Sequence, residues 1–328
     1  MSTLHDKSWF DATVVATTMV AEEIKRIELA VPFDVSCKAG EHIDVLLPGA
    51  ERQLKRSYSI VDADRQAGTV ALSVFRTPNS RGGSIMMHTL VPDSRLRVSS
   101  PQQDFPLRIG ARRYVLLAGG IGITAILSMA DTLRRVGANY HLIYVGRHRA
   151  AMAYLDRVIA DHGEKATIYV DAENKPLNVK QLVAEIDSDT ELYMCGPIRL
   201  MDAVRRTWHD TDLDITNLRF ETFGNSGWFE PEPFTVTVPR LGLTTQVEQD
   251  ESLLEALERA GADMMFDCRK GECGLCQVKI LSLQGRIDHR DVFFSEAQKN
   301  EELPATLCCC VSRVSGTDLS PNIELDIP

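Results

Sequence analysis

The spacing of cysteines near the C-terminus constrains this chain more than any other feature of its sequence. Six of the eight cysteines lie between residues 268 and 310, and the run CRKGECGLC places three of them at Cys268, Cys273 and Cys276. Three more stand side by side at 308–310. In a reducing compartment, cysteines clustered in this way indicate metal or redox chemistry rather than disulfide bonds.

The spacing C-x4-C-x2-C with a distant fourth cysteine is the plant-type [2Fe–2S] pattern. Four thiolates in such a site neutralise and hold two ferric ions that sulfide bridges. Gly271 and Gly274 would let the loop wrap closely, with backbone N–H groups directed at sulfur. A zinc site and buried free thiols are the alternatives, but zinc favours paired C-x2-C units and this cluster has one. We therefore predict an iron–sulfur site whose fourth ligand lies among residues 308–310.

Composition and charge disfavour several classes of partner. The 328 residues are 44% hydrophobic, enough for two or three domains. The net charge of −10 argues against nucleic acid and anionic membrane, since both select basic surfaces. Residues 234–328 hold 16 acidic and 9 basic side chains, so −7 of the charge lies there, as a docking surface for a basic partner or as a solvated surface. No run of 18 apolar residues and no leader pattern occurs, so we expect a cytoplasmic protein. A monomer is the default expectation for its oligomeric state.

In the first two thirds of the chain, the predicted secondary structure changes once, near residue 107. Residues 1–107 contain six short β-rich runs punctuated by Gly and Pro, which predicts a six-stranded antiparallel β-barrel. Residues 108–224 alternate strand-like and helix-like runs, which predicts a Rossmann-like α/β domain with a parallel sheet. Its helices are expected over 124–137, 151–163, 178–186 and 198–210.

The remaining residues have a third pattern, which indicates a linker and a further domain. Residues 225–233, with two prolines and no periodic pattern, are interpreted as a linker. Residues 234–328 begin with a hairpin-like run and continue with a helix, for which Ser252 and Glu255 supply a capping box and Gly261 a stop. With the cysteines, this stretch predicts an α+β domain of the β-grasp type, so the chain as a whole is multidomain.

Two motifs in residues 108–224 indicate nucleotide binding. The run YVLLAGGIGIT has a strand, a glycine turn and a helix, and it resembles the dinucleotide fingerprint at Gly119, Gly120 and Gly122. The run YMCGPIRLM ends a later strand with Cys195, Gly196 and Pro197. Because both turns fall at the carboxyl ends of parallel strands, they would face one crevice. Cys195 would lie there beside the nicotinamide, although a buried structural cysteine is the common alternative.

The choice between NADH and NADPH depends on the neighbouring strands. Asp171 ends the third strand, where a carboxylate can accept the ribose hydroxyls and repel a 2′-phosphate. That position favours NADH. Arg147 and Arg149, after the second strand, would favour a 2′-phosphate and argue the other way.

The barrel carries a flavin signature. The runs RSYS at 56–59 and RGGS at 81–84 each have an ordinary alternative, as a strand start and a turn. Together in a six-stranded barrel they resemble the flavin domain of the ferredoxin reductase superfamily. Tyr58 can pack on the flavin, and the Ser59 hydroxyl can reach flavin N5, where hydride arrives. Ser59 and Cys195, which would lie beside the nicotinamide, are therefore the predicted catalytic residues. Other predicted flavin contacts are Arg56, Ser57, Ser73, Val74, Phe75, Arg81, Gly82, Gly83, Ser84, Thr124 and Phe223.

The order of barrel, nucleotide domain and C-terminal ferredoxin resembles the phthalate dioxygenase reductase and vanillate O-demethylase reductase family over essentially the whole chain. The resemblance implies FMN (with FAD as alternative), NADH and a [2Fe–2S] cluster in one chain. It also implies a partner, a Rieske-type oxygenase that dihydroxylates or demethylates an aromatic compound. Another acceptor, such as a different monooxygenase, and a zinc-stapled binding module are the alternative interpretations.

The same resemblance selects among the three adjacent cysteines. The family ends its cluster motif in Cys-Val-Ser-Arg, and here Cys310 is the cysteine that directly precedes Val311, Ser312 and Arg313. Cys310 is therefore the expected fourth ligand beside Cys268, Cys273 and Cys276. Cys308 is the second choice, because it shares a face with Cys310 on an extended segment, whereas Cys309 would point away.

Overall fold

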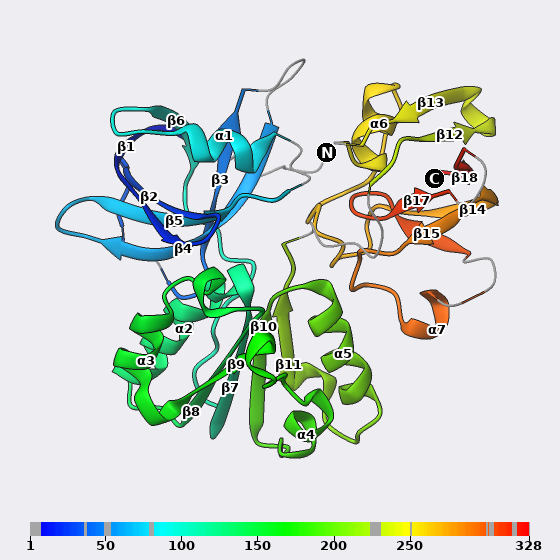
Figure 1. The fold of residues 1–328 in the computed structure, drawn as a ribbon. Helices are drawn as coiled ribbons and strands as arrows, with labels where there is room; N and C mark the ends of the chain where they lie inside the picture. The colour runs from blue at the N-terminus through cyan, green and yellow to red at the C-terminus, as the bar shows by residue number, and fades with distance from the viewer. Residues whose placement is uncertain are drawn as a thin grey trace. The chain divides into compact units, whose positions relative to one another are not determined.

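The computed structural model of the chain describes residues 8–35, 38–48, 54–78, 82–223, 231–249, 251–299, 301, 305–316 and 320–327. The chain divides into two compact units, Met1–Glu221 and Thr222–Pro328 (Figure 1). No helix among the described residues is long and apolar enough to cross a bilayer.

The first unit begins with a closed antiparallel barrel, which confirms the first part of the predicted fold. Its strand order is β1-β2-β5-β4-β3-β6. Alternating side chains fill the interior, among them the fully buried Ile27, Ile43 and Leu72. The bounds are β1 (Trp9–Ala21), β2 (Ile24–Ala30), β3 (His42–Leu47), β4 (Leu54–Asp64), β5 (Thr69–Phe75), α1 (Gly83–Thr89) and β6 (Arg95–Ser99).

A parallel five-stranded sheet follows in the same unit, in the order β11-β10-β7-β8-β9. The order reverses between β7 and β10, which creates the crevice at the carboxyl ends where doubly wound folds bind nucleotides. The strands are β7 (Arg113–Gly119), β8 (Tyr140–Gly146), β9 (Ala166–Val170), β10 (Thr190–Cys195) and β11 (Leu218–Glu221). This sheet confirms the predicted Rossmann-like fold.

Helices cover both faces of that sheet. The helices α4 and α5 bury Leu182, Val204 and Trp208 against one face, and α2 and α3 lie together on the other (Figure 1). Their bounds are α2 (Ile123–Arg135), α3 (Leu155–His162), α4 (Val179–Ala184) and α5 (Ile198–His209). Short 3-10 turns include η1 (Gly120–Gly122), η2 (Arg149–Ala151) and η4 (Asp171–Glu173).

The helix expected over 151–163 is wrong at its start. The structure begins α3 at Leu155, because Tyr154 has a φ of 60° and a left-handed conformation that cannot continue a right-handed helix. The phenol of Tyr154 lies 2.5 Å from the Ser73 hydroxyl on β5. The left-handed backbone of Tyr154 thus occurs together with a contact between its side chain and the barrel.

The second unit is an α+β domain with a mixed sheet in the order β13-β12-β18-β14-β16. The helix α6 starts at the predicted capping box of Ser252 and Glu255, and Gly261 follows it with a φ of 90°. The bounds are β12 (Phe234–Val238), β13 (Leu243–Val247), α6 (Leu253–Arg259), β14 (Gln277–Gln284), β15 (Arg286–Asp288), α7 (Glu296–Lys299), β16 (Thr306–Cys308), β17 (Arg313–Ser315) and β18 (Asn322–Asp326). The pair β15–β17 forms a separate small sheet.

Candidate active site

The two predicted nucleotide turns meet at the carboxyl ends of β7 and β10. A Cβ atom on Gly122 would lie 2.1 Å from the Cys195 carbonyl oxygen, and one on Gly119 would lie 2.7 Å from Pro197 Cδ. The Cα atom of Gly119 lies 3.0 Å from where a Cβ on Gly196 would stand. Both turns therefore require glycine for space, and Gly120 requires it for its φ of 52°. The structure brings together the predicted residues Gly119, Gly120, Gly122, Cys195, Gly196 and Pro197.

Asp171 lies apart from these turns, at the end of β9. It is exposed, in the turn η4, and the next residue donates its N–H to the Arg147 carbonyl at 2.9 Å. Glu173 in the same turn accepts two hydrogen bonds from Arg149, at 2.5 and 3.0 Å. This ion pair holds the pKa of Glu173 below its usual range. One of the two arginines that argued for NADPH is thus neutralised by a carboxylate.

The flavin motif forms a basic corner on the barrel. A Cβ atom on Gly83 would lie 3.1 Å from both Cγ and Nε of Arg56, so the arginine lies over the start of α1. Gly82 precedes that helix with a φ of 83° and, as a glycine, brings no side chain to cap its N–H groups. Tyr58 packs against the barrel core, and burial raises the pKa of its phenol. Arg81 lies outside the described residues.

Ser59 supplies a direct test of whether the barrel fits a flavin. Its residue is 7% exposed, and its hydroxyl oxygen is buried without a hydrogen-bond partner among the described residues. A buried hydroxyl without a partner costs free energy, so a ligand atom that bonds to it is expected. Strand β4 contacts α2, and β5 contacts η1, so the flavin strands adjoin the nucleotide turn. The hydroxyl therefore fits a flavin held against that turn.

Other predicted flavin residues have protein partners. Ser57 donates to Asp44 Oδ1 at 2.5 Å, and the Ser84 hydroxyl lies 2.9 Å from that of Thr77. Thr124 is buried and donates to the Ile121 carbonyl at 2.9 Å. Of the three residues on β5, Ser73 hydrogen-bonds to Tyr154, Val74 offers its carbonyl to His88, and Phe75 is half-buried.

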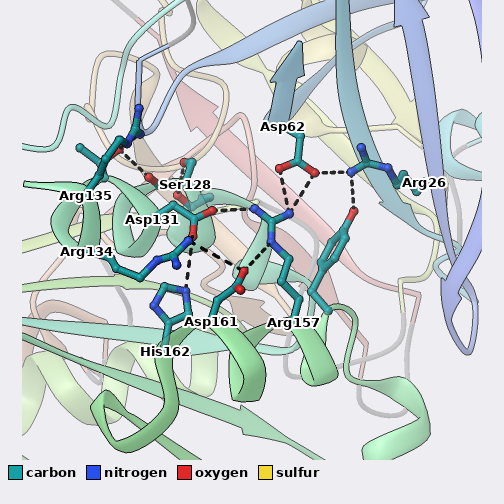
Figure 2. Close-up of polar contacts among 12 residues, drawn as sticks. Arg26, Asp62, Ser128, Asp131, Arg134, Arg135, Arg157, Asp161 and His162 are labelled. Atoms are coloured by element: carbon teal, nitrogen blue, oxygen red, sulfur yellow. Dashed lines mark hydrogen bonds and ion pairs between the residues drawn. The ribbon is translucent and has the colours of Figure 1, made fainter.

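A network of ion pairs between the barrel and α3 was not predicted from the sequence. Arg157 Nη1 donates to both carboxylate oxygens of Asp62 on β4, at 2.8 and 3.0 Å (Figure 2). Its Nη2 donates to Asp131 of α2 at 2.6 Å, and Arg26 of β2 donates to Asp62 at 2.5 Å. These residues fix the nucleotide domain to the flavin barrel. Their charges gave no periodic signal, because the partners lie far apart in the sequence.

The cysteine loop of the second unit has the backbone that its glycines predict. Gly271 and Gly274 have φ values of 77° and 74°. A Cβ atom on Gly274 would lie 2.3 Å from the Phe293 ring, and one on Gly271 would lie 2.6 Å from Val311. Three backbone N–H groups, from Lys270, Glu272 and Cys273, each lie 3.4 Å from Cys268 Sγ. Donors converging on one sulfur suit a thiolate that ligates a cluster.

Sulfur contacts link all four predicted ligands. Cys268 contacts Cys273 and Cys310, and Cys276 contacts Cys310 and Cys308. The thiol of Cys310 and the backbone donors lower the pKa of Cys268 to about 4, and contacts with Cys308 and Cys310 lower that of Cys276 to about 3. Within the described residues, no three His, Cys, Asp or Glu side chains have the arrangement of a site for one metal ion. Burial raises the pKa of Cys273, and the hydrogen bonds with Cys268 and Cys276 raise that of Cys310. Four sulfurs that contact one another in this way fit an iron–sulfur cluster.

The neighbouring cysteines differ in their surroundings. Cys309 is fully buried in the apolar core of the unit, and its carbonyl accepts a hydrogen bond from Leu254 at 2.9 Å. Cys308 ends β16. Of the proposed ligand sulfurs, its described contacts include that of Cys276 only. Cys310 contacts both halves of the loop. That difference favours Cys310 as the fourth ligand.

The chain leading into the second unit is tied to the cysteine loop. Thr222 donates its N–H to Glu272 Oε1 at 2.5 Å and its hydroxyl to the Lys270 carbonyl at 2.7 Å. Phe223 follows and is half-buried in this unit, so its predicted contact with the flavin stays a prediction.

Comparison with known proteins agrees with this geometry. Residues 11–106 match the family described as "Oxidoreductase FAD-binding domain", and residues 236–315 match "2Fe-2S iron-sulfur cluster binding domain". The cofactors are thus a flavin, a pyridine nucleotide and a [2Fe–2S] cluster. The expectation of FMN rather than FAD stays a prediction.

Full-length relatives share the whole arrangement. Tetrachlorobenzoquinone reductase of Sphingobium chlorophenolicum is 35% identical and covers 98% of each chain. A putative toluene-4-sulfonate monooxygenase system reductase subunit of Comamonas testosteroni is 34% identical over 93% of this chain and 96% of its own. The solved structure of phthalate dioxygenase reductase is 29% identical and covers 98% of each chain, with a TM-score of 0.74. This chain therefore belongs to the phthalate dioxygenase reductase family of flavin and [2Fe–2S] electron-transfer reductases.

Proposed function

We propose that this chain is the reductase component of a Rieske-type oxygenase that dihydroxylates or demethylates an aromatic compound. The observation that carries the proposal is the combination in one chain of a nucleotide crevice, a barrel with an orphaned Ser59 hydroxyl and a cysteine site. The relative from Comamonas is a reductase subunit of a monooxygenase system, and the solved neighbour is a dioxygenase reductase. A cytoplasmic monomer that docks transiently with its oxygenase is part of this proposal.

Different residues of the chain bind the nucleotide, orient the flavin ring and hold the flavin phosphate. The glycine turn and the turn from Cys195 to Pro197 hold the nicotinamide end of NADH, and Ser59 orients the flavin ring by its hydroxyl. Arg56, Arg81 and the N–H groups of Gly82–Ser84 hold the flavin phosphate. A bound flavin takes electrons from NADH in pairs and releases them singly, which is the conversion that a one-electron cluster requires. The protein positions these groups and keeps water from them.

Nucleotide and flavin preferences follow from the same residues. We assign NADH, because Asp171 would repel a 2′-phosphate and Arg149 is already paired with Glu173. We assign FMN, because the family resemblance implies it. Cys268, Cys273, Cys276 and Cys310 are the proposed cluster ligands. The proposed domains are 1–107, 108–224 and 234–328, with 225–233 as the linker; residues 224–230 lie outside the described part.

The electron path can be tested with cytochrome c as a one-electron acceptor. In the Cys273→Ser variant, NADH should still bleach the flavin, while cytochrome c reduction should fall to a small fraction of the wild-type rate. Unchanged cytochrome c reduction would show that the cluster is not on the path. NADPH in place of NADH should bleach the flavin more slowly. The oxygenase partner is then tested by whether the reduced protein reduces a purified Rieske centre.

A second candidate function is the reduction of a quinone. The observation that favours it is the 35% identity to tetrachlorobenzoquinone reductase over 98% of the chain. A quinone can take an electron pair from the flavin directly. Quinone reduction that survives Cys273→Ser, at a rate above that of any Rieske acceptor, would favour this candidate over the oxygenase role.

A further inference from the structure

Four consecutive ionisable residues are buried behind the cysteine loop. Asp288 and Asp291 are fully buried, and His289 and Arg290 are 6% and 8% exposed. Burying charge is costly unless each group is paired, so a run of this kind needs an explanation. Asp288 is paired with Arg290, whose Nη2 lies 2.7 Å from its carboxylate. Asp291 has different partners, and they lead to the cluster.

Asp291 joins the two segments that carry the proposed ligands. A Cβ atom on Gly271 would lie 2.8 Å from Asp291 Cα, and Val292 donates its N–H to the Gly271 carbonyl at 3.0 Å. On the other side, Ser312, two residues after Cys310, donates its hydroxyl to Asp291 Oδ1 at 3.4 Å. Backbone contact with one segment and a side-chain bond to the other place this carboxylate against both.

Residues outside the two ligand-bearing segments stabilise the negative charge of Asp291. The side chain of Lys299 in α7 is 7% exposed, and its ammonium donates to the Asp291 carbonyl at 2.6 Å and lies 3.8 Å from Asp291 Oδ2. His289 Nδ1 lies 3.2 Å from Oδ1, and the Phe294 N–H donates to Oδ2 at 2.9 Å. Burial acts to raise the pKa of Asp291, but these partners outweigh it and hold the pKa below its usual range. The carboxylate is therefore charged near neutral pH.

That charge lies next to the ligand-bearing segments, because Asp291 contacts Gly271 in the loop and Ser312, two residues after Cys310. Reduction adds one negative charge to an iron–sulfur cluster, and the potential depends on nearby charge, hydrogen bonds and exposure. A buried carboxylate should oppose reduction, and a buried ammonium should favour it.

We propose that Asp291 is a positioning residue that clamps the two ligand-bearing segments, and that Asp291 and Lys299 set the cluster's reduction potential in opposite directions. The inference rests on the proposed ligand set of Cys268, Cys273, Cys276 and Cys310. As an order of magnitude, a unit charge about 10 Å from any redox centre, at an effective dielectric constant of about 20, changes the reduction equilibrium of that centre roughly tenfold. For one electron, a tenfold change corresponds to 59 mV.

The test is a redox titration of the full protein, followed by the electron paramagnetic resonance signal of the reduced cluster. Asp291→Asn should raise the equilibrium constant for reduction about tenfold, and Lys299→Gln should lower it. The control is Asp326→Asn on β18, whose carboxylate is 48% exposed and lies 3.6 Å from Arg240; because solvent screens that charge, the variant should change the constant less than threefold. Iron and sulfide content is measured for every variant, so that only loaded protein is compared.

Opposite shifts in the two variants support the inference, because a purely structural role would not give opposite signs. Shifts of the same sign, or a change below threefold in Lys299→Gln, would overturn it. If Asp291→Asn does not fold, the Lys299→Gln result decides by itself. Absence of a reduced [2Fe–2S] signal in the wild-type protein would refute the proposed function, which is a distinct outcome from a failure of this inference.

Discussion

Replacing Arg157 with glutamine should loosen the nucleotide domain from the flavin barrel. Arg157 donates two hydrogen bonds to Asp62 of the barrel and one to Asp131 of α2, so one side chain spans both parts (Figure 2). Glutamine keeps a polar side chain of intermediate length but removes the charge and the planar fork. Arg157 and Asp62 are each 31% exposed, and Asp131 is 19% exposed.

The size of the loss follows from what remains after the substitution. Asp62 would keep Arg26 at 2.5 Å, and Asp131 would keep Arg134 and His162, each at 3.5 Å. No carboxylate is left unpaired, so the cost of about 3–5 kcal/mol for an orphaned buried ion does not apply. Exposed pairs contribute about 0.2–1 kcal/mol and buried hydrogen bonds to charged groups about 1.5–3 kcal/mol. For these half-buried contacts we expect a loss of about 2 kcal/mol.

Urea unfolding measures this loss, with the fluorescence of the buried Trp208 reporting on the nucleotide domain. A double-mutant cycle with Asp62→Asn should give a coupling energy of about 1 kcal/mol. The control is Arg112→Gln, which removes an ion pair to Asp189 at 2.8 Å whose arginine is 82% exposed, and which should cost less than about 0.5 kcal/mol. A coupling energy near zero, or equal losses for the two arginine variants, would refute the reasoning.

Three further predictions concern the individual sites. Cys310→Ser should abolish the visible spectrum of the cluster while Cys308→Ser retains it, and the reverse result would exchange the two assignments. Ser59→Ala should slow bleaching of the flavin by NADH about tenfold, the value of one hydrogen bond, with flavin content unchanged; stopped-flow rates equal to wild type would show that the hydroxyl does not act on the flavin. Glu173→Gln should release Arg149 and raise kcat/KM for NADPH roughly tenfold with little change for NADH, since a charged phosphate gains an arginine partner. An unchanged NADPH value would mean that this ion pair has no part in the preference.

Local patterns predicted the architecture because each depends on neighbouring residues. The capping box of Ser252 and Glu255 and the stop at Gly261 are set within one helix, and the structure has all three. The barrel and the parallel sheet were predicted from the change between strand-only runs and alternating strand and helix runs, whereas the strand order comes from the structure. The nucleotide turns followed from glycines that have no room for a Cβ atom, such as Gly122 against Cys195.

Contacts between distant segments could not be predicted in this way. Periodicity over 151–163 fits a helix, but the Tyr154 phenol bonds to Ser73 on a strand far earlier in the chain, and the helix starts one residue later than that tyrosine. Ser73 was expected to line the flavin, and nothing local shows that its hydroxyl faces Tyr154. Arg157 likewise looks like any exposed helix residue until Asp62 of the barrel is placed beside it.

The cysteine site shows how a local sequence pattern differs from contacts between distant segments in what it predicts. Spacing predicts the ligand loop, because the positive φ values at Gly271 and Gly274 and the N–H groups around Cys268 are properties of one short segment. The wall behind the loop consists of Asp291, Phe293 and Val311, which come from later in the chain and fill the space that the glycines leave. Ligand spacing by itself therefore does not determine which residues form the wall. Because the charge in the wall acts on the reduction equilibrium, two reductases with the same cysteine spacing should differ in potential wherever their residues at the Asp291 position differ in charge.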